Sequence, residues 1–134
     1  MAQLNDTNIT GTLSINENDV ADFIVEEGVS GDWTYKKWNS GIAECWCSKQ
    51  VTIPANPTAW GNSYIIKLNV INYPFTFISR PAQSMTLYTS DGSYWGMPNF
   101  NTTTSTGTYY CVRPTALTSA TTGVVSFIVK GKYK

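Results

Sequence analysis

The sequence predicts an all-β domain: an antiparallel β-sandwich of about eight strands, preceded by a short N-terminal helix or neck. Two observations carry this prediction. Apolar and polar residues alternate with a period of two from Trp33 onward, and runs of turn-forming residues separate the alternating segments. Threonine, serine and asparagine number 18, 12 and 11, a composition that favours strands joined by many loops.

Turn signals place the expected strands along the chain. The strands are expected at 33–38, 42–47, 49–53, 63–71, 75–78, 85–89, 108–113 and 124–130. The separating segments are NSG, PANP, NYP, SDGS, GMPN, TTTSTG and ATTG. The long apolar runs in 63–71 and 124–130 favour central core strands, and the polar loop 99–107 is expected to be mobile.

The first 30 residues predict a different structure. Ser14, with Glu17 three positions later, fits a capping box, and Gly28 supplies a stop, so a helix of about ten residues is expected between them. The apolar stripe of this helix consists of Val20, Phe23 and Ile24. So short a helix is marginal alone in water, so it must pack on its own domain or on copies of itself around a symmetry axis. We therefore divide the chain into an arm and oligomerisation neck (1–30) and a head domain (31–134).

Residues 33–47 predict a hairpin around NSG, because glycine at the end of a three-residue loop accepts the left-handed backbone needed there. Pairing Trp38 with Ile42 places Lys36 opposite Glu44. One face then carries Thr34, Lys36, Trp38, Ile42, Glu44 and Trp46. The other face carries Trp33, Tyr35, Lys37, Ala43, Cys45 and Cys47, and it suits the domain core.

The face with Trp38, Ile42 and Trp46 is too apolar to lie in water comfortably. A second sheet of the same domain, a neighbouring subunit or a ligand would cover it. Together with the helix stripe, these three residues form our predicted oligomer interface.

The residue types present exclude several kinds of chemistry. The protein has no histidine, which removes Ser-His-Asp and Cys-His nucleophile systems and histidine-based metal sites. After Glu44 the only carboxylate is Asp91, so a pair of acids for glycoside hydrolysis is poorly supported. We expect no enzymatic activity, no metal and no cofactor.

The three cysteines are odd in number, and Cys45 and Cys47 lie too close along one strand for an easy bridge. A disulfide from Cys111 and an incomplete zinc site are alternatives. Reduced, buried thiols that fill the core are the favoured interpretation.

Net charge is zero but unevenly distributed. Residues 1–44 hold eight carboxylates against two lysines, and residues 45–134 hold seven basic groups against one carboxylate. This asymmetry would steer head-to-tail contacts or attract anionic polymers, or is simply a solvated surface. Basic and aromatic residues are not interleaved as nucleic-acid binding requires, so no nucleic acid is expected. The sequence has neither a membrane-spanning segment nor a signal peptide, which predicts synthesis in the cytoplasm without membrane insertion.

Aromatic residues gather around two turns. Tyr88, Tyr94 and Trp95 surround SDGS, and Trp60 and Tyr64 flank the turn in WGNSY. Exposed aromatic faces are common in ligand sites, so these five residues are the candidate ligand-binding set. Packing in the core or at an interface is the alternative for each of them.

The run ADFIVEEGVSGDWTYKKWNSGIAECWC resembles a signature of tailed-phage and prophage structural proteins, notably tail-fibre and baseplate proteins of Gram-positive hosts. NYPFTF (72–77) and KGKYK (130–134) extend the likeness over residues 19–134. The resemblance implies a terminal β-sandwich head, typically a homotrimer, on the tail or capsid surface of a virion. Other virion proteins and a host cell-wall glycan would then be its partners, and no catalytic residue carries over.

Family members usually carry this domain at the end of a long chain. Here it makes up most of the chain, which is therefore either a small dedicated structural protein or part of a longer one. A purely architectural role, as a capsid decoration or tail-tip component without a receptor, is the main alternative. A small cell-wall polysaccharide hydrolase is a further alternative, which the shortage of acids after residue 44 disfavours.

Overall fold

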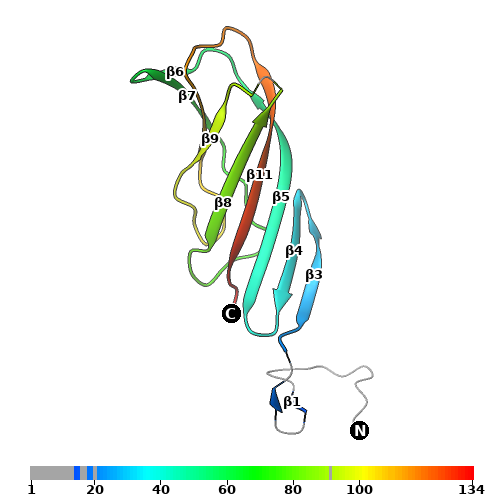
Figure 1. The fold of residues 1–134 in the computed structure, drawn as a ribbon. Coiled ribbons are helices and arrows are strands. Elements are labelled where there is room, and N and C mark those ends of the chain that lie inside the picture. Colours follow the sequence, from blue (N-terminus) through cyan, green and yellow to red (C-terminus); the bar gives the residue numbers. More distant parts are fainter. Residues whose placement is uncertain (1–13, 16–17, 20, 91) are drawn as a thin grey trace.

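Two antiparallel sheets, one of five strands and one of four, pack face to face in the computed structural model of the chain (Figure 1). The structure describes residues 14–15, 18–19, 21–90 and 92–134. The predicted all-β sandwich is confirmed, and the described residues contain no helix.

The five-stranded sheet has the order β3-β4-β5-β11-β8. Its strands are β3 (Ile24–Ser30), β4 (Trp33–Trp38), β5 (Ile42–Ile53), β11 (Thr121–Lys132) and β8 (Ala82–Thr89). β5 and β11 pair along their whole lengths, from Ile42 opposite Lys132 to Ile53 opposite Thr121. These two strands, of 12 residues each, form the centre of the sheet.

The four-stranded sheet has the order β6-β7-β10-β9. Its strands are β6 (Thr58–Trp60), β7 (Ser63–Leu68), β10 (Tyr109–Arg113) and β9 (Trp95–Pro98). Near the N-terminus, β1 (Ser14–Ile15) pairs with β2 (Asn18–Asp19) in a separate two-stranded ladder.

The predicted N-terminal helix is wrong. Residues 24–30 form β3, which extends the five-stranded sheet by pairing with β4. Glu26 lies opposite Lys37, and the Lys37 ammonium stands 2.8 Å from the Glu26 carboxylate. A ladder of backbone hydrogen bonds along an existing strand satisfies this segment better than a marginal helix of about ten residues. Val20, which we assigned to the helix stripe, lies outside the described residues.

Two further strand predictions need correction. The segment 42–53 is one continuous strand rather than two, because Ser48 keeps its place in the ladder opposite Ser126. Residues 75–78 form no strand. The backbone N–H groups of Phe77 and Ile78 donate to two different segments, at the carbonyls of Thr103 and Lys132, so no single ladder can form.

The predicted hairpin at residues 33–47 is confirmed. Lys36 lies opposite Glu44 and Thr34 opposite Trp46, in the register inferred from the sequence. Gly41 closes the turn with a φ of 96°, and its N–H donates to the Trp38 carbonyl at 3.0 Å. This backbone conformation suits glycine, which has no Cβ to clash.

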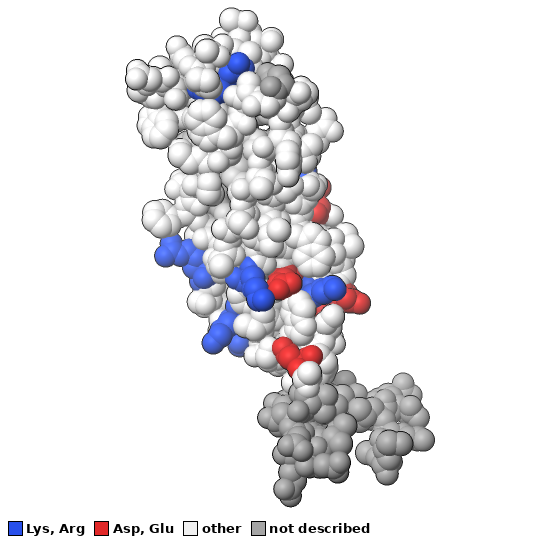
Figure 2. Space-filling view, viewed as in Figure 1, with Lys and Arg blue, Asp and Glu red and all other residues white. Residues whose placement is uncertain are grey.

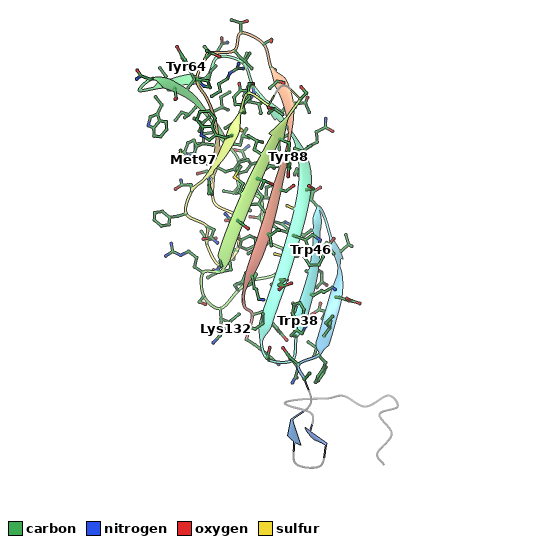
Figure 3. The ribbon with its side chains drawn as sticks, viewed as in Figure 1. Trp38, Trp46, Tyr64, Tyr88, Met97 and Lys132 are labelled. Carbon is green, nitrogen blue, oxygen red and sulfur yellow. The ribbon has the colours of Figure 1, made fainter. Side chains whose placement is uncertain are left out.

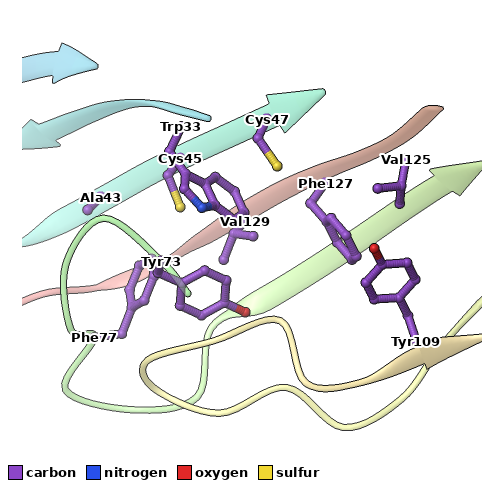
Figure 4. Packing of buried hydrophobic residues seen from close by; sticks show 10 residues of the cluster. All are labelled: Trp33, Ala43, Cys45, Cys47, Tyr73, Phe77, Tyr109, Val125, Phe127 and Val129. Carbon is purple, nitrogen blue, oxygen red and sulfur yellow. The ribbon is translucent and has the colours of Figure 1, made fainter. Parts of the chain in front are cut away.

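The core lies between the two sheets (Figure 4). Its main cluster consists of Trp33, Ala43, Cys45, Cys47, Tyr73, Phe77, Tyr109, Val125, Phe127 and Val129. Rings meet edge to face, with centroids 5.6 Å apart for Trp33 and Tyr73 and 5.3 Å apart for Tyr109 and Phe127. The residues of β4 and β5 predicted to face the core, Trp33, Ala43, Cys45 and Cys47, are buried there.

All three cysteines are free and buried, which confirms the prediction of reduced core thiols. Burial raises the pKa of the Cys45 thiol to about 12 and those of Cys47 and Cys111 to about 11. Because only the thiolate reacts readily, these side chains are poor nucleophiles in the folded protein.

We expect iodoacetamide at pH 8 to leave the folded protein unmodified. The raised pKa values reduce the thiolate fraction by about a hundredfold or more, and burial blocks access. Intact-mass spectrometry should show no adduct on the native chain and three adducts per chain after unfolding in guanidinium chloride. Stoichiometric labelling of the native protein at the rate of a free thiol would show that the thiols are exposed.

Candidate functional site

The outer face of the five-stranded sheet carries large apolar side chains. We call it the tryptophan face and define it by Ile24, Trp38, Ile42, Trp46 and Ile128 together with the charged row described below. The four-stranded sheet packs on the opposite side, and Figure 3 shows Trp38 and Trp46 on the side turned away from it. The Ile128 side chain is 63% exposed, and within the described residues no strand packs over this face. Exposed apolar patches of this kind usually mark contact surfaces.

A row of alternating charges crosses the tryptophan face. Glu27 lies opposite Lys36, Lys36 opposite Glu44, and Glu44 opposite Lys130, so the signs alternate over four neighbouring strands. The Lys130 ammonium stands 3.1 Å from the Glu44 carboxylate. Cross-strand pairs of opposite charge stabilise a sheet modestly, and an alternating row can also pair with a second copy of itself shifted by one strand.

Apolar rows flank the charged row on both sides. On one side, Trp46 lies opposite Ile128, and on the other, Ile24 lies opposite Trp38. Two shallow hollows interrupt this surface beside Lys130. One, of about 240 Å³, is lined by Asp22, Trp38, Ile42, Glu44 and Lys130. The other, of about 260 Å³, is lined by Ala82, Gln83, Ser84, Ile128 and Lys130. A surface of ridges and shallow hollows is suited to a protein partner rather than to an enclosed small molecule.

The segment before β3 is fixed onto the β4–β5 turn. The Ser40 N–H donates to the Asp22 carboxylate at 2.9 Å, its hydroxyl bonds the same carboxylate, and the Asn39 N–H donates to the Phe23 carbonyl at 2.9 Å. The hydrogen bond from the Ser40 hydroxyl is the main reason that the pKa of Asp22 is lowered. These bonds bring Ile24 next to Trp38.

The structure thus brings together four of the six predicted interface residues. Ile24, Trp38, Ile42 and Trp46 share the tryptophan face, although Ile24 reaches it from a strand and not from a helix. Phe23 is half-buried just before β3.

The five candidate ligand-binding aromatics are split over separate surfaces. Trp95 and Trp60 are about half exposed, and the strand register places both on the outer face of the four-stranded sheet. Tyr88 projects from the outer face of β8, opposite Val124. Tyr64 is half-buried at the β6–β7 hairpin (Figure 3).

Tyr94 does not lie on a surface. Its side chain is only 5% exposed, and the guanidinium carbon of Arg113 lies 5.0 Å from the centre of its ring. Tyr94 packs with Ile53, Ile66 and Cys111 in a second core cluster, so we remove it from the candidate contact residues.

Sequence reasoning missed Phe100, which is 78% exposed in the loop 99–107. This loop, which its polar composition predicts to be mobile, is instead held by hydrogen bonds. The Tyr73 N–H donates to the Thr104 carbonyl at 2.8 Å, and the Thr102 N–H donates to the Ser105 carbonyl at 2.9 Å. The sequence signal that could have indicated this exposed residue is a single aromatic residue between two asparagines in a polar loop.

On the face that Figure 2 shows, most charged side chains lie in the half of the head nearer to the start of β3, a smaller basic group lies near the opposite end, and the zone between them carries almost none. Within residues 21–90 and 92–134, no group of three histidine, cysteine, aspartate or glutamate side chains could hold a metal ion. In the same part of the chain, no helix is long and apolar enough to cross a membrane.

Comparison with solved structures shows what the fold resembles. The chain is similar to a fragment of the P. aeruginosa R1 pyocin fibre that comprises its C-terminal residues 323–701, with a TM-score of 0.54 and 15% identity. The match covers 84% of this chain and 28% of that fragment. A fragment of the R2 pyocin fibre from the same organism matches with a TM-score of 0.45 and 14% identity, over 98% of this chain and 37% of that one. No protein-family model and no curated protein sequence matches the chain. The chain therefore has a tail-fibre-like fold and spans less than half of each fibre fragment.

Proposed function

We propose that this chain is a structural protein of a phage or prophage virion, a trimeric head of the tail-fibre or baseplate type that binds the host cell surface without catalysis. The single observation that carries the proposal is the fold likeness to the R1 pyocin fibre. The hairpin motif at residues 32–47, which resembles tail-fibre and baseplate proteins, supports the same class.

The tryptophan face supports the trimeric part of the proposal. A sheet face with exposed Ile128 beside half-exposed Trp46 loses unfavourable contact with water when sister chains cover it. The alternating charged row supplies a register for that contact, since a misplaced copy would bring like charges together.

The far end of the head supports the adhesive part. The β6–β7 hairpin lies at the end of the molecule opposite to the start of β3 (Figure 1). Trp60 and Trp95 present exposed indole rings on the four-stranded sheet. In a trimer, three weak sites held together would act as one strong site, because the later contacts form at high effective concentration.

We propose to test this role with the fluorescently labelled full chain on a panel of bacterial cells and on a glycan array. Binding should be saturable, and the double variant Trp60→Ala/Trp95→Ala should weaken it by about tenfold or more, since aromatic anchors dominate contacts of this kind. Val29→Ala, which truncates an exposed apolar side chain on β3 of the other sheet, is the control. Binding that does not change in the double variant would exclude these tryptophans as the contact.

An architectural role without a receptor is the second candidate. The scatter of the exposed aromatics over separate surfaces favours it. Firm incorporation into virions, with no binding to any cell or glycan, would support this role and contradict the adhesive one.

A further inference from the structure

We infer that a cleft beside the loop 99–107 is a binding site for an anionic sugar residue, one that carries a carboxylate or a phosphate group. The cleft has a volume of about 360 Å³ and is lined by Arg80, Gln83, Pro98, Asn99, Phe100 and Asn101. That volume lies at the small end of ligand pockets, which span roughly 300–1,000 Å³, and it suits a single sugar residue of a longer polymer. The inference rests on the proposed function, because it names the class of glycan that the host surface would present.

A partly buried hydrogen-bond network holds two of the three amide side chains of the cleft, those of Gln83 and Asn101, in place. The Tyr73 hydroxyl donates to the side-chain Oε1 of Gln83 at 2.8 Å, and the Gln83 side-chain amide donates to the backbone carbonyl of Thr106 at 3.2 Å. The Asn101 amide donates to the Tyr73 hydroxyl at 3.1 Å and to the Pro81 carbonyl at 2.9 Å. Polar groups fixed before a ligand arrives lose little entropy on binding, so they favour affinity and specificity.

The backbone of the loop is closed so that Phe100 stands at the rim of the cleft. Gly107 has a φ of 71°, and a Cβ added there would lie 2.0 Å from the Phe100 carbonyl oxygen. Only glycine permits this approach. On the other side, the side-chain Oδ1 of Asn99 accepts the Phe100 N–H at 2.8 Å, and the side-chain amide of Asn99 donates to the Thr108 hydroxyl at 3.2 Å.

A positively charged side chain, Arg80, lies beside the aromatic ring of Phe100 at this rim. The Arg80 guanidinium carbon lies 5.2 Å from the centre of the Phe100 ring, within the distance of a cation–π contact. The ion pairs among the described residues use Lys37, Lys49 and Lys130, and none of them uses Arg80.

An exposed aromatic residue alone is ordinary on a protein surface. Here it stands beside an arginine without a carboxylate partner among the described residues and beside pre-positioned amides. A guanidinium pairs with carboxylate or phosphate through two parallel hydrogen bonds, the ring offers an apolar platform to the C–H face of a sugar, and the amides bond its hydroxyls. This combination favours an anionic sugar over a neutral one.

The test is calorimetric titration of the full chain with three probes: tetragalacturonate, its fully methyl-esterified form as the neutral match, and an oligomer of ribitol phosphate. At least one acidic probe should bind, and the methyl ester should bind about tenfold more weakly or not at all. Arg80→Gln and Phe100→Ala should each weaken the acidic probe by about tenfold, and Lys67→Gln, an exposed cation on β7, should leave its binding unchanged. The acidic probe that binds identifies the carboxylate or the phosphate as the natural anion.

Three outcomes would overturn the inference. The first is that neither acidic probe binds at millimolar concentration. The second is that the Arg80→Gln and Phe100→Ala variants bind the acidic probe as tightly as the wild-type chain does. The third is a fall in assembled mass on Phe100→Ala, which would place Phe100 in a subunit contact. The cell-binding assay separates this inference from the proposed function. Cell binding without acidic-sugar binding removes the cleft alone, and acidic-sugar binding without cell binding removes the adhesive role alone.

Discussion

Replacing Ile128 with aspartate should convert the assembled protein into folded monomers. Ile128 projects from β11 on the tryptophan face, between Trp46 on β5 and Ser84 on β8, and it is 63% exposed in the single chain. If sister chains cover this face, the substitution buries an unpaired carboxylate at every contact, which is strongly unfavourable. Because the side chain points away from the core, the fold of each chain should survive. Light scattering should report the loss of mass and circular dichroism the retained fold.

Thr122→Asp is the matched control for this experiment. Thr122 lies on the same strand and on the same side of the sheet, paired with Thr52, but it is not one of the residues that define the tryptophan face. It adds the same charge, so a general effect of charge would appear in both variants. An Ile128→Asp protein that keeps the mass of the wild type would exclude the tryptophan face from the subunit contact.

Replacing Phe127, the neighbour of Ile128, should instead destabilise the chain itself. Phe127 is 1% exposed, and its ring meets that of Tyr109 edge to face at 5.3 Å between the two sheets. Phe127→Ala leaves a cavity where the sheets pack, and such changes cost about 3–5 kcal/mol. This is a large part of the roughly 5–15 kcal/mol by which a domain is stable.

Denaturation in urea should measure this loss, with the Ile128→Asp monomer as background so that dissociation does not contribute. Thr122→Ala, an exposed position on the same strand, should change the free energy of unfolding by no more than about 0.5 kcal/mol. A loss below about 1 kcal/mol for Phe127→Ala would mean that the inner face of β11 is not packed as described.

The regular part of the fold could be predicted because its signals are local. The alternation in 33–47 and the glycine of NSG determine both the turn and the side of the sheet on which each residue lies, so the register of β4 and β5 followed directly. The burial of Cys45 and Cys47 followed from the same alternation.

Two other segments were predicted wrongly, for different reasons. A capping box and an apolar stripe indicated a helix in the leader, but a two-residue turn that contains Gly31, with a φ of 59°, lets residues 24–30 pair with the adjacent strand β4 in a ladder with one bulge. Phe75 and Phe77 have the alternation of a strand, yet they lie in a loop whose backbone bonds to Thr103 and Lys132. Contacts distant in the sequence decided the second outcome.

The candidate sites were predictable only in part, for the same reason. Trp38, Ile42 and Trp46 share a face because hairpin register is local, and the addition of Ile128 required the pairing of β11 with β5. The cleft depends on Arg80, Gln83 and Phe100, which come together through the bonds of Tyr73 and Asn101. Composition alone indicated a mobile loop there.

The central claim is that sister chains cover the tryptophan face, and the mass of the protein in solution tests it most directly. Multi-angle light scattering of the full chain should give three times the chain mass of 14.8 kDa at micromolar concentration. A mass of 14.8 kDa that persists as the concentration is raised to the millimolar range would contradict the account.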